Sequence, residues 1–135
     1  MKFDIIIVGG GHAGVEAAVA SAKFGLEIGI VTMSPEAIGR MSCNPAIGGL
    51  AKSQVVREVD ALGGIMGICA DKSAIQYRVL NRSKGAAVRA TRSQNDRIAY
   101  EIEIQSQLSK FDNISIIKGE VTSVSVNNGI THGVM

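Results

Sequence analysis

A glycine-rich segment close to the N-terminus has the spacing of a phosphate-binding turn. In GGGHAG, residues 9–14, Gly9, Gly11 and Gly14 match the pattern G-x-G-x-x-G. In dinucleotide-binding folds the first glycine allows a tight turn, the second lets a pyrophosphate approach the backbone, and the third lets helix and strand pack closely. The N–H groups at the start of the helix then bind the phosphates. The segment follows a strand-like run and opens a helix-like one, which favours a dinucleotide site over a glycine turn without a ligand.

The residue that would bind the ribose is not the usual one. Dinucleotide folds commonly end the second strand with an acidic residue about 20 residues after the glycines. Thr32 occupies that place here, and Glu36 comes slightly late. A threonine hydroxyl can bond a ribose hydroxyl, although less strongly than a carboxylate. His12 fills a variable position of the glycine pattern, and we interpret it as a spacer at the helix start because nothing near it in the sequence pairs with it.

A second segment, RMSCNPAIGG at residues 40–49, places one cysteine before a Gly-Gly pair. In a βαβ fold this segment returns to the nucleotide crevice at the carboxyl ends of the strands. If Gly48 and Gly49 open a helix, the thiolate of Cys43 is favoured by the helix N-terminus and is more available as a nucleophile. The alternative is that Cys43 is a small buried residue, and the spacing alone favours that alternative.

The elements that would position these segments follow from apolar runs and glycines. The β-branched run 5–8 predicts a buried strand, and the runs 12–25 and 26–33 predict a helix closed by Gly25 and a second strand. We also predict helices at 48–64 and 95–111, strands at 74–80, 114–119 and 120–126, and a hairpin turn at 127–129. The predicted inner faces of those two helices are Leu50, Val55, Val59 and Leu62, and Ile98, Ile102 and Leu108 or Phe111. The order of elements predicts an α/β, Rossmann-like fold.

Length and composition limit the class of protein. A chain of 135 residues suffices for one domain with a core, and its net charge of +2 excludes a polyanion-binding tail but not a local basic patch. The two cysteines, Cys43 and Cys69, are too few for a disulfide scaffold and lack metal-like spacing, so we expect no metal and a reducing, cytoplasmic location. The sequence stops at Met135 within a strand-like run, and we therefore expect residues 1–135 to be the N-terminal part of a larger, truncated domain.

Four segments together resemble the GidA/MnmG family of flavoproteins. They are GGGHAGVEAA, MSCNPAIGGLAK, VREVDALGG and the run IQYRVLN-SKG-AAVRATRSQNDR. The resemblance extends from about Phe3 to at least Val121, and the second and fourth segments are far more specific than the glycine turn. It implies an FAD-binding domain of the glutathione-reductase type, incomplete here, with a β-hairpin at its C-terminal end. Members modify the wobble uridine of tRNA with a carboxymethylaminomethyl-type group, using FAD, NADH and a folate one-carbon donor.

The resemblance also implies roles for individual residues. Cys43 matches a family cysteine implicated in activity, which reverses the interpretation from spacing and makes it the candidate catalytic residue. Val121, in KGEV, matches a position that contacts the adenine end of FAD through its backbone. The implied cofactor-binding residues are Gly9, Gly10, Gly11, His12, Ala13, Gly14, Thr32 and Val121. The implied partners are tRNA, a GTPase of the MnmE type reached through segments absent here, and a second copy in a homodimer.

Some features depart from the family. Ala86 stands where relatives often have proline, Cys69 is interpreted as buried packing, and no C-x4-C pair indicates a flavin–disulfide relay. Family members are several times longer, so the nicotinamide site lies outside this sequence and the isolated chain is expected to be inactive.

A basic run and several alternatives stay open at this stage. Between Arg78 and Arg97 there are six basic residues against one acid, which fits contact with FAD phosphates or with tRNA, or else a solvated face. Other functions compatible with the sequence are a non-catalytic FAD or ADP-binding module, a remnant without function, or a folate-dependent tRNA methyltransferase of the TrmFO type. That methyltransferase ends its second strand with an acid and lacks SCNPAIGG, so the GidA/MnmG reading is favoured. A nicotinamide-only dehydrogenase is less favoured again because of Thr32.

Overall fold

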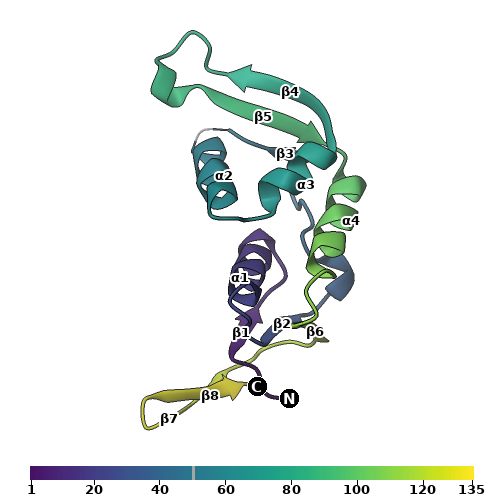
Figure 1. Cartoon of the computed structure of the whole chain (residues 1–135), viewed down its shortest axis with the longest axis vertical. Coiled ribbons are helices and arrows are strands. Elements are labelled where there is room, and N and C mark those ends of the chain that lie inside the picture. The colour runs from purple at the N-terminus through teal and green to yellow at the C-terminus, as the bar shows by residue number, and fades with distance from the viewer. Residues whose placement is uncertain (50) are drawn as a thin grey trace. The chain divides into compact units, whose positions relative to one another are not determined.

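A computed structural model of the chain describes residues 1–49 and 51–135 (Figure 1). The chain divides into two compact units, which we describe separately. The first unit contains residues Met1–Ile38 and Leu108–Met135, and the second contains Gly39–Gln107. The predicted α/β class is confirmed by this mixture of helices, a parallel sheet and antiparallel strands.

The first unit is built on a parallel three-stranded sheet. Its sheet strands are β1 (Ile5–Val8), β2 (Ile28–Thr32) and β6 (Ile114–Lys118), in the order β1-β2-β6, and α1 (His12–Ala22) connects the first two. A short 3-10 helix, η1 (Pro35–Ala37), follows β2. The strands are paired in step, with Ile5, Ile28 and Ile114 at one level. The predicted strand–helix–strand sequence around the glycine turn is therefore confirmed.

One face of α1 holds this unit together. Val15, Ala18, Val19 and Ala22 are buried along the helix at intervals of three and four residues, which places them on one side. The helix ends before Gly25, whose φ of +76° is the left-handed conformation typical of a residue just after a helix.

The hairpin predicted at the end of the sequence is also present. It joins β7 (Val124–Asn127) to β8 (Ile130–Val134) in antiparallel pairing. Asn128 and Gly129 have φ values of +49° and +77°, the two positive angles that a type I′ turn needs. The Asn-Gly pair thus explains why the chain reverses there.

The second unit has an antiparallel sheet in the order β3-β5-β4. Its elements are β3 (Ala46–Ile47), α2 (Lys52–Ala61), α3 (Met66–Lys72), β4 (Ala74–Leu80), the 3-10 helix η2 (Ala86–Val88), β5 (Ala90–Asn95) and α4 (Arg97–Leu108), of which Leu108 is assigned to the first unit. The predicted strand at 74–80 is confirmed, whereas α3 and β5 were not predicted. β5 has the polar sequence ATRSQN and shows no apolar alternation.

The predicted start and inner face of α2 are wrong. The helix begins at Lys52 and not at residue 48, because Gly48, Gly49 and Ala51 have φ values of +116°, +148° and +62°, which no α-helix contains. Leu50 lies outside the described residues. Val55 and Leu62 are 54% and 88% exposed, so these two do not form the inner face.

The inner face predicted for α4 is right at Leu108, which is buried, and wrong at Ile98 and Ile102, which are exposed. Tyr100 and Ile104 are buried in their place, and they precede Leu108 at the same helical spacing. The helix carries two apolar stripes, and the sequence pattern alone does not choose between them. Its start is fixed by Asp96, because one carboxylate oxygen of that residue accepts hydrogen bonds at 2.9 Å from the N–H groups of residues 98 and 99.

A buried polar cluster organises the second unit around Asn95. The side-chain amide of Asn95 donates to the carbonyl of Ala70 and, at 2.9 Å, to the hydroxyl of Ser73, while its oxygen accepts a bond from Ser93 at 2.9 Å. Asn95 is 1% exposed, so none of these groups could exchange its partner for water. The cluster connects α3 to β5.

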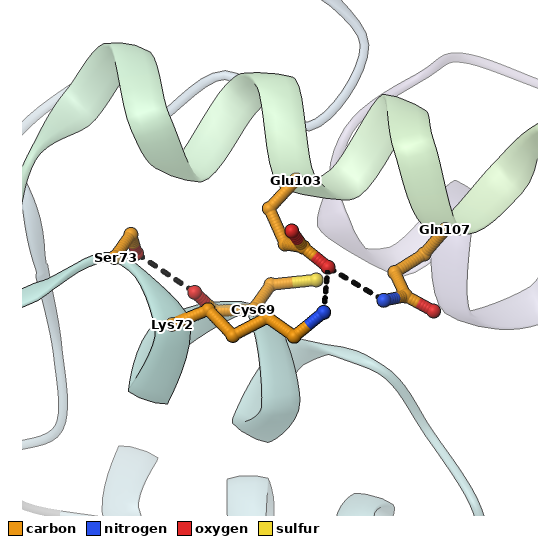
Figure 2. A network of polar contacts seen from close by, with 5 residues as sticks. All are labelled: Cys69, Lys72, Ser73, Glu103 and Gln107. Atoms are coloured by element: carbon orange, nitrogen blue, oxygen red, sulfur yellow. Dashed lines mark hydrogen bonds and ion pairs between the residues drawn. The ribbon is translucent and has the colours of Figure 1, made fainter.

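A second set of polar contacts links α3 to α4 (Figure 2). The ammonium group of Lys72 lies 2.6 Å from a carboxylate oxygen of Glu103, which also accepts a bond from the amide of Gln107. The hydroxyl of Ser73 donates to the carbonyl of Cys69 at 2.7 Å. Cys69 itself is fully buried, as predicted.

Within the described residues, no helix is both long and apolar enough to cross a membrane.

The Asn95 cluster generates a prediction about stability. Replacing Asn95 with leucine, which has a similar volume, should lower the free energy of unfolding by about 2–4 kcal/mol, because it leaves buried polar groups of α3 and β5 unsatisfied. Urea denaturation followed by far-UV circular dichroism measures this change. Gln76→Leu, at an exposed amide of β4, serves as the control and should change the value by less than about 0.5 kcal/mol. Equal free energies of unfolding for the Asn95→Leu and Gln76→Leu variants would contradict the assignment of Asn95 as an organising residue.

Candidate functional site

The glycine turn of the first unit has the geometry that its sequence predicts. Gly9 has a φ of +103°, and its N–H donates to the carbonyl of Val31 at 2.8 Å. A Cβ atom at Gly14 would lie 2.1 Å from the carbonyl oxygen of Gly9, so only glycine lets α1 pack this closely on the turn. A Cβ at Gly11 would meet nothing within 4 Å. Gly9 and Gly14 are thus required by the backbone geometry of the turn, whereas Gly11 leaves the backbone accessible to a ligand.

The start of α1 offers donors for an anion. Gly11 is the residue before the helix, no side chain caps this end, and the first turn contains no acidic residue. His12, Ala13 and Gly14 form that first turn, and the first N–H groups of a helix have no partner within it. Together with the helix dipole, such groups favour a phosphate or another anion.

The predicted adenosine-side residues lie at the same edge of the parallel sheet. Thr32 ends β2, and its hydroxyl oxygen lies 3.5 Å from the place of a Cβ at Gly10. The N–H of Gly119, just after β6, donates to the carbonyl of Thr32 at 3.0 Å. Val121 follows two residues later and is half-buried. The carboxyl ends of adjacent parallel strands are where α/β folds bind ligands.

Cys43 belongs to the second unit and is exposed with a free thiol. Its carbonyl accepts a hydrogen bond from the guanidinium group of Arg97, at 2.7 Å. Close by in the sequence, Arg40 forms an ion pair with Glu101 at 3.3 Å. Two residues of α4 therefore hold the segment that carries Cys43. The expected helix start at Gly48 was wrong, so the argument from a nearby helix N-terminus no longer supports an activated thiolate.

The segment after Cys43 is joined along its length to β5. The N–H of Asn95 donates to the carbonyl of Pro45 at 2.8 Å, and β3 pairs with residues 93 and 94. A Cβ at Gly48 would lie 2.2 Å from the carbonyl oxygen of Thr91, which explains the glycine. The hydroxyl of Ser53 donates to that same carbonyl at 2.6 Å. The SCNPAIGG segment and the AVRATR run are thus neighbours in space, which the sequence analysis missed because it did not identify β5.

A cavity of about 260 Å³ lies inside the second unit and was not predicted. Side chains from α2, α3 and the sheet line it, including Arg57, Asp60, Asp71 and Tyr77. The hydroxyl of Tyr77 donates to a carboxylate oxygen of Asp71 at 2.8 Å, and this bond raises the pKa of Tyr77. The carboxylates of Asp60 and Asp71 and the phenol of Tyr77 supply polar groups to its lining.

Comparisons with known proteins identify the family. The family model described as Glucose inhibited division protein A matches residues 4–135. The tRNA uridine 5-carboxymethylaminomethyl modification enzyme MnmG of Protochlamydia amoebophila (strain UWE25) is 47% identical over 135 residues, which is 100% of this chain and 22% of that protein. The protein of the same name from Thermodesulfovibrio yellowstonii (strain ATCC 51303 / DSM 11347 / YP87) is 52% identical over 133 residues, covering 98% of this chain and 21% of that protein.

A solved structure gives the same result. GidA from Aquifex aeolicus, in its form I crystal, matches with a TM-score of 0.94 and 44% identity, covering 99% of this chain and 22% of that one. The chain spans about a fifth of the length of the curated relatives that it matches. Because the family model covers nearly all of the sequence, the chain belongs to the glucose inhibited division protein A family.

Proposed function

We propose that these residues are the FAD-binding part of a flavoenzyme that modifies the wobble uridine of tRNA. The observation that carries the proposal is the glycine turn, whose open Gly11 and uncapped helix start suit a pyrophosphate, in a chain whose relatives are named as tRNA uridine modification enzymes. We further propose that both compact units belong to one domain, residues 1–135 being its N-terminal part. Turnover would require segments beyond these residues.

The pyrophosphate of FAD would bind at residues 9–14. There the N–H groups of the first turn of α1 would donate to phosphate oxygens, and Gly11 would let the phosphates approach the backbone. The residues present fit this group, since a Cβ at Gly11 would point into open space and the first turn has no acid to repel an anion.

The adenosine end of FAD would lie along the edge of the parallel sheet. Thr32 would bond a ribose hydroxyl, and the backbone of Val121 would contact the adenine. This placement is supported by the approach of the Thr32 hydroxyl to Gly10 in the glycine turn, and by the bond from the Gly119 N–H to the Thr32 carbonyl, which joins the ends of β2 and β6. A hydroxyl at Thr32 would leave this end uncharged, unlike the carboxylate of many dinucleotide folds.

Cys43 would act on the target base as a nucleophile or an acid. Its exposure supports this role, because a buried thiol could not reach a base. Arg97 would be a positioning residue, since its hydrogen bond to the Cys43 carbonyl fixes the backbone from which the thiol projects.

The remaining cofactors and partners come from the family resemblance. When bound, FAD would supply redox chemistry, with NADH as reductant and a folate as one-carbon donor. The whole protein would act in the cytoplasm as a homodimer with a GTPase of the MnmE type, and these contacts would involve segments other than residues 1–135. The 135 residues by themselves would bind FAD without turnover.

FAD binding is tested by titrating the chain with FAD and following flavin fluorescence. The wild-type chain should bind saturably, and Gly11→Val should weaken binding at least tenfold because the new side chain would occupy the path of the pyrophosphate. Gly85→Val is the matched control, since a Cβ at Gly85 also meets nothing within 4 Å and its φ is −57°. A folded wild-type chain that fails to bind FAD, or a Gly11→Val chain that binds normally, would refute the proposed site.

The accessibility of Cys43 is tested by alkylation of the native chain with iodoacetamide. Cys43 should react about tenfold faster than Cys69, or more, because only the exposed thiol can be reached by the reagent. Mass spectrometry of peptides identifies each adduct, and Cys43→Ser removes the fast one. Urea should make the two rates converge. Equal rates in the native chain would remove the basis for a role of Cys43 at the target base.

A further inference from the structure

The structure separates the six basic residues between Arg78 and Arg97 into three groups. Arg97 lies in α4 and is used internally, because it donates to the carbonyl of Cys43. Arg78 and Arg92 lie on the two long strands of the sheet, β4 and β5. The other three lie in the connection between those strands and are exposed: Arg82, Lys84 and Arg89.

Arg78 and Arg92 face each other directly across the β4–β5 ladder. Residues opposite each other in an antiparallel pair have Cβ atoms about 4.5–5.5 Å apart, and like charges in such a pair destabilise the sheet. The neighbouring pair on the same face is Gln76 with Gln94. These four side chains, with Leu80, line a hollow of about 210 Å³. We call this hollow the arginine pocket.

In the part of the chain that the structure describes, no carboxylate pairs with Arg78 or Arg92. Among residues 1–49 and 51–135, neither Arg78 nor Arg92 forms an ion pair, unlike Arg40, which pairs with Glu101, and Lys72, which pairs with Glu103. A third cation lies nearby, since partial burial and the positive charge of Arg92 lower the pKa of Lys52. Positive charge is thus concentrated around Arg92, and the opposed arginines weaken the ladder.

We propose that the arginine pocket binds a backbone phosphate of tRNA, an inference that rests on the proposed function. Two guanidinium groups supply charge-assisted donors to one phosphate, and the amides of Gln76 and Gln94 supply neutral ones. Arg82 and Lys84, which are exposed in the connection that follows β4, would supply further positive charge for the successive phosphates of a polynucleotide.

The other face of the hairpin indicates that the contact does not read bases. Tyr77 is the aromatic residue of β4, and it points to the opposite face of the sheet, where its hydroxyl is bonded to Asp71. Among the described residues, no aromatic side chain lines the arginine pocket, so they offer no stacking partner for unpaired bases there. Phosphate contacts position a nucleic acid without selecting its sequence. The pocket would therefore orient any tRNA that reaches it.

The test compares the double variant Arg78→Gln/Arg92→Gln with the wild-type chain and with Lys2→Gln/Lys110→Gln, which removes the same charge elsewhere. Binding of two unrelated fluorescently labelled tRNA transcripts is followed by anisotropy at several salt concentrations. For the arginine double variant we expect about tenfold weaker binding of both tRNAs at low salt. We also expect the slope of log K against log salt to fall by about 1–2. The lysine double variant should keep most of the affinity.

Two further readouts distinguish the alternatives. FAD binding should be unchanged in the arginine double variant, and its melting temperature should be equal or higher, because removing opposed like charges relieves the ladder. Loss of FAD binding with normal tRNA binding would assign the pocket to the flavin and overturn the proposal. The proposal would also be overturned if the arginine double variant bound tRNA as tightly as the wild-type chain, or if the lysine double variant lost as much affinity for tRNA. A wild-type chain that binds no tRNA would overturn it as well.

If the glutamine variant does not fold, Arg78→Lys/Arg92→Lys keeps the charge. This lysine-for-arginine variant should bind tRNA more weakly than the wild-type chain but with the same slope of log K against log salt. A slope that falls by about 1–2, as expected for the glutamine variant, would also overturn the proposal. FAD binding by the wild-type chain tests the proposed function separately from all of these outcomes.

Discussion

The second unit depends on the pairing of β5 with strands on both of its sides. On one side β5 pairs with β4 over six residues, and on the other it pairs with the two residues of β3. A short β3 could not hold by itself, so Gly48 brings the backbone against β5 and Ser53 bonds the same strand. This pairing fixes the segment that carries Cys43 and the hairpin that carries the arginine pocket. Both therefore depend on one polar strand, whose end is secured by Asn95.

The first unit depends in a comparable way on a glycine, Gly14, at a point where two backbone segments meet. The approach of Gly14 to the carbonyl of Gly9 leaves no room for a Cβ, and it sets how α1 starts over the end of β1. The open donors of α1 and the carboxyl ends of β2 and β6 meet at that place as a consequence. In each unit a glycine, Gly14 or Gly48, allows close contact between backbone segments, and the proposed functional residues belong to the segment that this contact positions. The proposed flavin site and the Cys43 segment thus share a physical basis.

The sequence predicted the first unit well because its signals are local. A β-branched run, a glycine pattern and an Asn-Gly turn each specify their own conformation, and β1, α1, β2 and the last hairpin were all identified. The second unit was predicted poorly because tertiary contacts decide it. β5 is polar, since its buried side chains include Ser93 and Asn95, which are satisfied only by partners distant in the sequence. In α4 two apolar stripes were available, and packing of Ile104 against Gly39 accompanies burial of Tyr100 and Ile104, which were not predicted.

The two proposed anion sites differ in their effect on the stability of the fold. At α1 the donors are backbone N–H groups of the first turn, which have no partner within the helix, so an anion there uses what the fold already provides. At the β4–β5 hairpin, by contrast, Arg78 and Arg92 oppose each other and weaken the ladder that holds them. The hairpin tolerates this because its far end is closed by a bond of 2.9 Å from the amide of Asn81 to the carbonyl of Val88. Its near end is held by the Asn95 cluster. A phosphate bound between Arg78 and Arg92 would replace this repulsion with attraction, so the proposed contact would offset the cost that the two like charges impose on the ladder.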